Sequence, residues 1–230
     1  MSSLCFDIGD AGNIEVVPAL LVIAGWTGRD RVAIEHHIEE LARLGVRRPS
    51  SVPLYYRASR SLLTQAEDVE MLGAASSGEV EPVLVRHDGR WWLTVGSDHT
   101  DRSVETYSVA VSKQMCAKPV ARVAWAWDEV AERADGLVLH SEIFEAGRWV
   151  TYQEGPLARI RPLPALVDSL PAEVSVTEGL VLFCGTHGAI PDAAGVGIRP
   201  ALRMRLALID AVASRHILHE YRVTTLPQIA

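Results

Sequence analysis

The sequence predicts a β-rich α+β fold with a few helices, in a single domain spanning residues 1–230. Three observations predict this class. Two segments carry the pattern of β-hairpins, two apolar runs are typical of buried strands, and helical spacing is confined to a few short stretches. No repeat, low-complexity tract or clear linker divides the chain. Hydrophobic residues make up 48% of the sequence, which is enough for a core.

The N-terminal part predicts a strand, a helix and an extended segment. Residues 14–25 are almost continuously apolar and predict a buried strand. Asp30 can cap the helix that follows. The three- to four-residue spacing of that helix is carried by Ala33, His37, Leu41 and Leu44. Gly45 ends the helix, and the prolines beyond it predict an extended segment over residues 46–59.

Two hairpins occupy the middle of the chain. In residues 81–98, β-prone runs flank Asp88-Gly89, which is a strong short-range turn signal. Residues 137–155 repeat this pattern with a turn at Ala146-Gly147. The stretch between the hairpins, residues 118–136, predicts a short strand and a helix.

The C-terminal third begins with a further buried strand. Residues 178–188 run from an apolar stretch into a glycine-containing loop. Residues 201–227 fit either one helix, on their leucine spacing, or two strands. Both readings stay open at the level of the sequence.

Composition excludes several functional classes. A net charge of −7, with no basic run, argues against a nucleic-acid partner, because phosphate binding needs a basic surface. The three scattered cysteines, Cys5, Cys116 and Cys184, predict small buried thiols in a reducing compartment rather than disulfides. The N-terminus lacks the basic region of a signal peptide, and the longest apolar run is too short to cross a bilayer. We therefore expect a cytoplasmic protein with no membrane contact.

Three acidic residues form the candidate metal site. Glu79 and Glu81 are two residues apart at the start of a predicted strand, so their side chains share one face. The hairpin then returns the chain to Asp98, on the neighbouring strand. Adjacent carboxylates repel each other unless a cation lies between them, and hard cations prefer oxygen ligands. An ordinary solvent-exposed strand face is the alternative on spacing alone.

The order of three motifs resembles the fumarylacetoacetate hydrolase superfamily. That superfamily carries Glu-x-Glu early in a strand, then Asn-Asp-x-Ser-x-Arg-Asp, then Thr-Gly-Thr-Pro after an apolar strand. Here the three positions are taken by GEVE, SDHTDRS and FCGTHGA, and the likeness extends over about residues 20–190. Ser97, Ser103 and His187 depart from the motifs. The chain looks most like a compact bacterial branch, and the resemblance implies a rolled, layered β-sheet core and a homodimer.

The resemblance implies that Glu79, Glu81 and Asp98 hold Mg²⁺, with Mn²⁺ or Ca²⁺ as alternatives. It also implies that Arg102 lies close to the substrate-binding site and orients a metal carboxylate through a bidentate hydrogen bond. Three carboxylates around one dication leave a net charge of −1. A cationic neighbour such as Arg102 or Lys113 would neutralise it.

A histidine–glutamate pair and a lysine are the candidate catalytic groups. On the predicted helix, three-residue spacing pairs His37 with Glu40 and, as the alternative, His36 with Glu39. The resemblance implies that such a pair deprotonates a water. We favour the pair of His37 and Glu40, because His37 shares the apolar face of the helix.

Lys113 lies where the family places an active-site lysine, whose charge would stabilise an enolate or a substrate carboxylate. Lys118 is a close alternative. The resemblance also implies a group of substrate contacts: Tyr56, Arg57, Gln153, Gly185 and Thr186.

The predicted function is a metal-dependent hydrolase of a small 1,3-dicarbonyl or 2-keto acid. The resemblance implies that water attacks a carbonyl, and that the C–C bond breaks to give an enolate stabilised by the metal and Lys113. A decarboxylase or a keto–enol tautomerase of 2-keto acids is the alternative among enzymes, because neither reaction needs an attacking water. A non-catalytic ligand-binding protein on the same scaffold is the third reading.

Overall fold

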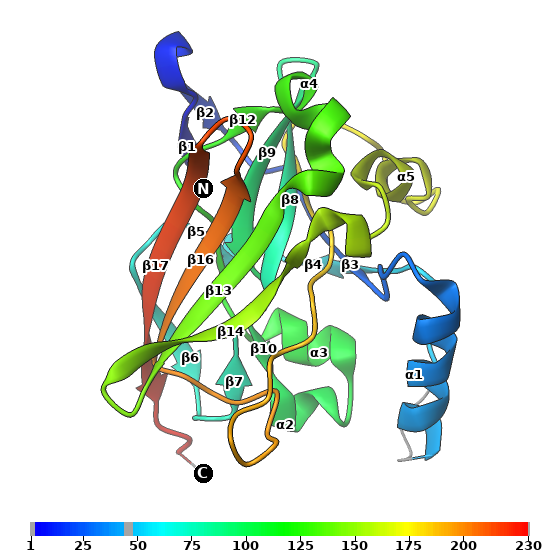
Figure 1. The fold of residues 1–230 in the computed structure, drawn as a ribbon, viewed down its shortest axis with the longest axis vertical. Coiled ribbons are helices and arrows are strands. Elements are labelled where there is room, and N and C mark those ends of the chain that lie inside the picture. Colours follow the sequence, from blue (N-terminus) through cyan, green and yellow to red (C-terminus); the bar gives the residue numbers. More distant parts are fainter. Residues whose placement is uncertain (1–2, 44–47, 230) are drawn as a thin grey trace.

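Two β-sheets form the body of the protein (Figure 1). The computed structural model describes residues 3–43 and 48–229. Within helix α1 (Arg31–Arg43), the side chains of residues 37 and 40–43 lie outside this description. The prediction of a β-rich α+β fold is confirmed.

The first sheet has six strands and mixes parallel and antiparallel pairs. Strands β15 and β3 run parallel to each other, and their other neighbours are antiparallel. The order across this sheet is β12 (Trp125–Ala126), β9 (Arg90–Ser97), β8 (Val80–His87), β15 (Leu180–Phe183), β3 (Leu20–Gly25) and β4 (Leu54–Ala58).

The second sheet has five strands and lies in front in the view of Figure 1. Only β6 pairs in parallel, at one edge. The order across this sheet is β14 (Arg148–Pro156), β13 (Val138–Glu145), β16 (Arg203–Asp210), β17 (Arg215–Leu226) and β6 (Asp68–Leu72).

Short elements surround the two sheets. Three two-stranded pairs are β1 (Leu4–Asp7) with β2 (Asn13–Val16), β5 (Leu63–Thr64) with β11 (Lys118–Pro119), and β7 (Ser76–Ser77) with β10 (Thr100–Asp101). The remaining α-helices are α2 (Arg102–Glu105), α3 (Val109–Gln114), α4 (Trp127–Val130) and α5 (Leu163–Asp168). Single 3-10 segments are η1 (Gly9–Ala11), η2 (Arg60–Leu62), η3 (Ala131–Gly136) and η4 (Leu157–Arg159).

Both predicted hairpins are confirmed. Strands β8 and β9 turn at Asp88-Gly89, where both residues have positive φ angles, of 49° and 68°. Strands β13 and β14 turn at Ala146-Gly147 with φ angles of 49° and 80°. Positive φ at both turn positions matches the right-handed twist of the flanking strands, which is why these dipeptides fix the register of each hairpin.

Two expectations from the sequence change in the structure. The predicted strand over residues 14–25 is divided into β2 and β3, because Pro18 has no N–H to continue the ladder. The ambiguous segment 201–227 forms the two strands β16 and β17. Its leucine spacing reflects alternation across the sheet rather than a helical face.

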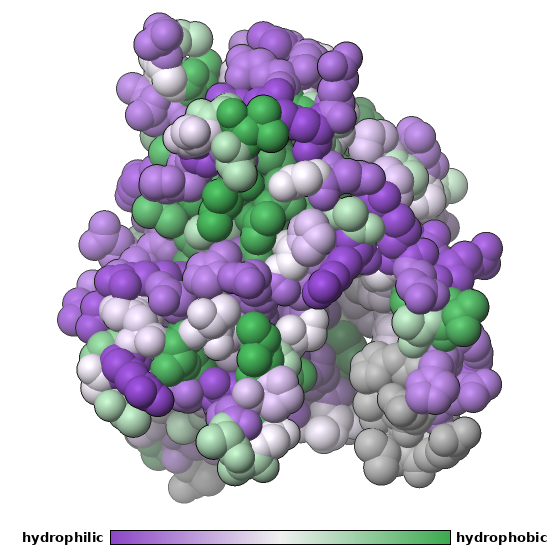
Figure 2. Space-filling model, viewed as in Figure 1, coloured by the Kyte–Doolittle hydropathy of each residue, from purple (hydrophilic) through white to green (hydrophobic). Residues whose placement is uncertain are grey.

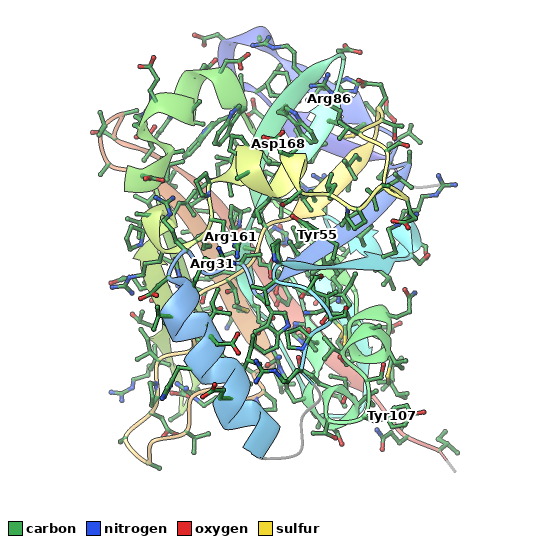
Figure 3. The ribbon with its side chains drawn as sticks, turned by 90° about the vertical axis from the view of Figure 1, so that its right-hand side faces the viewer. Arg31, Tyr55, Arg86, Tyr107, Arg161 and Asp168 are labelled. Carbon is green, nitrogen blue, oxygen red and sulfur yellow. The ribbon has the colours of Figure 1, made fainter. Side chains whose placement is uncertain are left out.

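The helix after Asp30 is confirmed as far as it is described. The Asp30 carboxylate accepts hydrogen bonds from the N–H groups of Val32 and Ala33, at 2.9 Å and 3.1 Å. Leu44 and Gly45, where we expected the helix to end, lie outside the described residues. Figure 3 shows α1 in front of the sheets, with Arg31 in its first turn. Among the described helices, none has the length and apolarity needed to cross a membrane.

The hydrophobic core covers both faces of the six-stranded sheet. Along β3, Val22 and Ala24 belong to the cluster between the two sheets, whereas Leu21 and Ile23 belong to a second cluster on the opposite face. Burial on both faces explains why this strand is a continuous apolar run rather than an alternating one. Cys116 and Cys184 are buried free thiols, but Cys5 is exposed, so the prediction of a buried thiol is wrong there. Cys5 occupies the outward position of β1.

The five-stranded sheet has one polar outer face. Arg203 and Arg205 both form ion pairs with Glu220, at 2.5 Å and 2.8 Å, and Arg205 lies over the ring of Trp149. Figure 2 shows hydrophilic residues crossing this face between more hydrophobic areas.

Candidate active site

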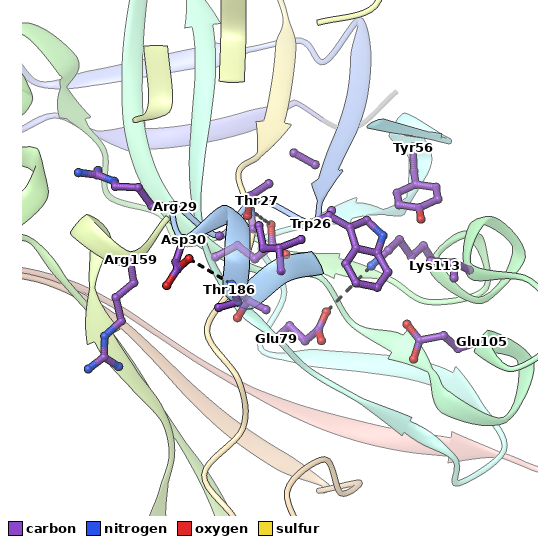
Figure 4. Close-up of a pocket in the computed structure, with 18 of the residues that line it drawn as sticks. Trp26, Thr27, Arg29, Asp30, Tyr56, Glu79, Glu105, Lys113, Arg159 and Thr186 are labelled. Carbon is purple, nitrogen blue, oxygen red and sulfur yellow. Dashed lines mark hydrogen bonds and ion pairs between the residues drawn. The ribbon is translucent and has the colours of Figure 1, made fainter. Parts of the chain in front are cut away.

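A cavity of about 800 Å³ opens at one edge of the six-stranded sheet (Figure 4). Strands β3 and β15 are parallel, so both end at this edge, whereas the antiparallel β8 begins there. Gly25, Glu81 and Gly185 come from these three strand ends and line the cavity. Tyr56 on β4 and Lys113 on α3 complete one of its walls.

The structure brings Glu79, Glu81 and Asp98 together at this edge. Glu79 directly precedes β8, Glu81 lies within it, and Asp98 directly follows β9. The hairpin register pairs Glu81 with Gly96, and the N–H of Asp98 donates to the carbonyl of Glu79 at 3.0 Å. One carboxylate oxygen of each acid lies within 4.8 Å of the others. We call these three residues the carboxylate triad.

Burial disfavours the ionised form of the acids in the carboxylate triad. Glu81 is 2% exposed and Asp98 is 0% exposed. Burial raises the pKa of Glu81 well above its usual value, and the charge of Asp98 raises it further. Burial also pushes the pKa of Asp98 upward, but the charges of Lys113 and Lys118 outweigh it and lower that pKa. The triad therefore depends on positive charge close by.

Two lysines hold Asp98 from opposite sides. The Lys113 ammonium donates a hydrogen bond to Oδ2 of Asp98, and Nζ of Lys118 lies 3.2 Å from Oδ1. Lys118 is fully buried and also donates to the backbone carbonyl of His99. Burial lowers the pKa of Lys118, whereas the surrounding carboxylates overcome burial and raise the pKa of Lys113. Only Lys113 lines the cavity among the two lysines weighed from the sequence.

Arg102 forms an ion pair with Glu79 through one nitrogen, in place of the bidentate hydrogen bond that the resemblance implies. One terminal nitrogen lies 3.0 Å from Oε1 of Glu79, and the other donates to Glu105 at 2.8 Å. Its Nε donates to the hydroxyl of Ser77 at 2.7 Å. These contacts hold the guanidinium beside the carboxylate triad. Arg102 is not among the described residues that line the cavity.

Gly185 supports the triad through its backbone. Its N–H donates to Oε2 of Glu81 at 2.8 Å. Its φ angle is +98°, and a Cβ at this position would lie 1.7 Å from Oγ1 of Thr27. The N–H of Gly185, a residue that we expected to contact the substrate, is thus directed at Glu81, in a conformation that only glycine fits.

Gln153 and Thr186 join the strand of the triad to the glycine loop. Gln153 is buried, accepts from the N–H of Val80 at 2.9 Å and donates to Thr186 and to the carbonyl of His187. The Thr186 hydroxyl donates to the carbonyl of Val80 at 2.7 Å and lines the cavity. Gln153 does not line it among the described residues, so its contacts are with the protein.

Tyr56 and Arg57 point to opposite sides of β4, as successive strand residues do. Tyr56 lines the cavity, and its ring centroid lies 5.8 Å from Nζ of Lys113. Burial raises the pKa of Tyr56, an effect that the charge of Lys113 opposes. Arg57 is exposed and outside the described cavity lining, which places it away from a bound substrate.

The predicted water-activating pair, His37 and Glu40, lies on helix α1. The first turns of this helix contribute Asp30, Ala33 and Ile34 to the cavity wall. The side chains of His37 and Glu40 lie outside the described ones, so their role stays a prediction.

Several residues at the cavity were not expected from the sequence. Glu105 and Trp26 line it, the first paired with Arg102 and the second directly after β3 with a φ angle of 60°. Glu105 follows Arg102 by three residues, and this spacing could have predicted their ion pair on a helix. Arg159 lies on the side of Figure 4 opposite Lys113, and it forms no ion pair with another described side chain. No local sequence pattern predicts Arg159 as a site residue, because it is the packing of η4 that brings it to the cavity.

The donor set of the triad fits a hard divalent cation. Its ligand atoms are all carboxylate oxygens, and the charge next to the buried Oδ1 of Asp98 is the Lys118 ammonium at 3.2 Å. Two oxygens on opposite sides of Mg²⁺ are about 4.2 Å apart, and on opposite sides of Ca²⁺ about 5 Å apart. Oxygens that all lie within 4.8 Å of one another are therefore compatible with either ion. A dication would also offset the repulsion that raises the pKa of Glu81.

A second acidic group lies far along the same hairpin. His87, Asp88 and Glu178 also bring ligand atoms within 4.8 Å, but the two acids are exposed. The Glu178 carboxylate accepts the N–H groups of Asp88 and Gly89, at 2.7 Å and 3.0 Å. This group therefore has a structural explanation as a clamp on the hairpin turn.

Comparisons with known proteins agree on the fold. The structure is similar to that of a proposed fumarylpyruvate hydrolase from Burkholderia cenocepacia, with a TM-score of 0.67 and 17% identity over 99% of this chain and 94% of that one. It is also similar to a 2-keto-3-deoxyarabinonate dehydratase, with a TM-score of 0.64 and 14% identity over 97% and 79% of the two chains. A search of curated proteins gave no match.

A third similar structure is the 4-oxalocrotonate decarboxylase of Pseudomonas putida G7, complexed with calcium and acetate. It has a TM-score of 0.51 and 15% identity over 88% of this chain and 76% of that one. At these identities the likeness concerns the fold, which is that of the fumarylacetoacetate-hydrolase-like superfamily. The model of a family described as a protein of unknown function, DUF2848, matches residues 24–221. The chain therefore belongs to the DUF2848 family.

Proposed function

We propose that this protein is a divalent-cation-dependent enzyme that hydrolyses a C–C bond in a small 1,3-dicarbonyl or 2-keto acid. The observation that carries the proposal is the convergence of Glu79, Glu81 and Asp98 at a cavity of about 800 Å³ that also holds Lys113. The similar structures support it, since they include a proposed hydrolase, a dehydratase and a decarboxylase of keto acids. One structure of the dehydratase contains magnesium and 2,5-dioxopentanoate.

The carboxylate triad would hold Mg²⁺, with Mn²⁺ or Ca²⁺ as alternatives. When bound, such a cation acts as a Lewis acid toward the adjacent oxygens of a chelating keto acid. Arg102 keeps Glu79 in place, and the N–H of Gly185 does the same for Glu81. Lys118, which is buried, lies 3.2 Å from Asp98 and fixes it. The chain thus orients every acid of the triad with a separate donor.

The hydrolytic step needs a base and an electron sink. We assign the base to His37, with Glu40 as its partner, following the family resemblance. The base takes a proton while the water oxygen bonds to the acyl carbonyl carbon. The C–C bond then breaks, its electron pair passes to the enolate of the keto acid fragment, and a proton completes that product. Lys113 lies on the cavity wall, where its ammonium would stabilise the enolate charge.

The test is an assay of the purified protein with Mg²⁺ and a panel of acylpyruvates, 2-keto acids and their enols. We expect an acylpyruvate to yield pyruvate and the free carboxylic acid in equal amounts. Release of CO₂ without cleavage to two acids identifies a decarboxylase instead, and ultraviolet changes without any cleavage identify a tautomerase. Binding without turnover of any compound would support the ligand-binding reading and contradict the proposal.

The predicted base gives a second check on the type of reaction. Replacing His37 by glutamine is expected to lower the kcat of hydrolysis by about 10²- to 10⁴-fold, because the attacking water loses its proton acceptor. The same change at His36, which is exposed, is the matched control and should leave kcat nearly unchanged. Full activity of the His37→Gln protein would favour decarboxylation or tautomerisation, which need no attacking water.

Assembly and location are further parts of this proposal. The homodimer predicted from the family resemblance and the cytoplasmic location predicted from the composition stay predictions. A small keto acid or dicarbonyl compound remains the proposed partner of the site.

A further inference from the structure

The Lys113 ammonium lies among the acids of the carboxylate triad. Its Nζ donates to Oδ2 of Asp98 and lies 4.0 Å from Oε2 of Glu79. The side chain is only 8% exposed, so solvent does little to weaken these interactions. Figure 4 shows the contact with Glu79 on the cavity wall. A positive charge therefore already occupies the space between these two carboxylates.

We propose that Lys113 is an internal counter-ion of the carboxylate triad, and that a divalent cation binds there by displacing its ammonium toward the ring of Tyr56. The inference rests on the proposed function, because it concerns the cation that the triad would hold. In this inference Lys113 weakens the binding of the cation, whereas Arg102, Lys118 and the N–H of Gly185 strengthen it.

Competition follows from the carboxylates that the ammonium and a cation would share. The Lys113 ammonium makes a charge-assisted hydrogen bond to Asp98 and lies 4.0 Å from Oε2 of Glu79, and a cation would need both of these acids at coordination distances of about 2 Å. The two positive charges would also repel each other across that distance. One of them must move when the other occupies the site.

Lys118 cannot be the residue that moves. It is 0% exposed, its ammonium also donates to the carbonyl of His99, and it holds the other oxygen of Asp98. Lys113, in contrast, lies on the wall of the cavity. The two lysines thus have different roles, Lys118 positioning Asp98 and Lys113 exchanging with a cation.

The structure also provides a place for the displaced ammonium. The ring of Tyr56 lies 5.8 Å from Nζ of Lys113, within the range of a cation–π interaction, and lines the same wall. Glu105 is a second acceptor at this wall. In that place the ammonium faces the interior of the cavity, where it would meet the negative charge of a substrate.

The test is calorimetric titration of the full-length protein with Mn²⁺, comparing wild type with Lys113→Gln. Glutamine keeps a hydrogen-bond donor for Asp98 and removes the charge. We expect the variant to bind Mn²⁺ at least about tenfold more tightly, since like charges at such a distance shift ionic equilibria by one or more powers of ten. Arg159→Gln is the matched control, because it removes a cavity-lining charge that has no contact with the triad. It should change the affinity by less than about twofold.

Thermal unfolding gives an independent readout. Without Mn²⁺ the Lys113→Gln protein should unfold at a lower temperature than wild type, because the triad loses its counter-ion, and saturating Mn²⁺ should close that gap. Equal or weaker Mn²⁺ binding by Lys113→Gln, with binding by wild type intact, would overturn the inference and leave the proposed function standing. Absence of Mn²⁺ binding by all three proteins would overturn the proposed function itself.

Discussion

Replacing Glu81 by glutamine is expected to lower the affinity of the protein for Mn²⁺ by more than about 100-fold, since loss even of a residue that only orients a ligand typically costs 10- to 100-fold. Ionisation of Glu81 is unfavourable in the free protein, because burial and the charge of Asp98 both raise its pKa. A bound dication repays that cost, and an amide cannot supply the charge. Calorimetric titration of the variant against wild type measures the loss.

The Glu81→Gln protein should remain folded. Glutamine matches the uncharged glutamic acid in shape, and its carbonyl oxygen can accept the N–H of Gly185. Asp101→Asn is the matched control, because Asp101 is a buried acid near the triad that caps helix α2 through the N–H of Val104. Its asparagine variant should bind Mn²⁺ nearly as wild type does. An equal loss of affinity in both variants would contradict a specific role for Glu81.

Replacing Gly185 by alanine is expected to destabilise the protein by about 3 kcal/mol or more. The φ angle of +98° disfavours any L side chain, and the new Cβ would lie 1.7 Å from Oγ1 of Thr27. The backbone must then move, and Glu81 loses the N–H that it accepts. Urea unfolding of the variant and wild type measures the difference in the free energy of unfolding.

Gly188 provides a control within the same loop. It has open space where a Cβ would lie, and its φ angle is outside the left-handed region. Gly188→Ala should change the free energy of unfolding by no more than about 0.5 kcal/mol. If Gly185→Ala were as harmless as Gly188→Ala, the loop would have room to relax, and the tight support of Glu81 described above would be wrong.

The sequence contained the parts of this architecture that depend on local signals. Asp88-Gly89 fixes a hairpin of known register, and that register alone places Asp98 beside Glu79. The alternation of a strand places Glu81 on the same face as Glu79. The convergence of the triad therefore follows from one hairpin turn and from the two-residue period of a strand, both of which the sequence predicts.

Other features depended on packing between distant segments. Gly185 and Gln153 were expected to contact a substrate, but burial directs their hydrogen bonds to Glu81, Val80 and the glycine loop. The different positions of Lys113, on the cavity wall, and Lys118, buried beside Asp98, likewise could not be predicted from their spacing. They are set by where α3 and β11 dock, which depends on contacts across the whole fold.

The central claim is that Glu79, Glu81 and Asp98 together hold a divalent cation. The most direct measurement is an anomalous difference map from crystals of the wild-type protein soaked in Mn²⁺. We predict a peak that is coordinated by one oxygen of each of these three acids, at distances of about 2 Å. A map with no peak at the triad, or with its peak at His87, Asp88 and Glu178 instead, would contradict the account.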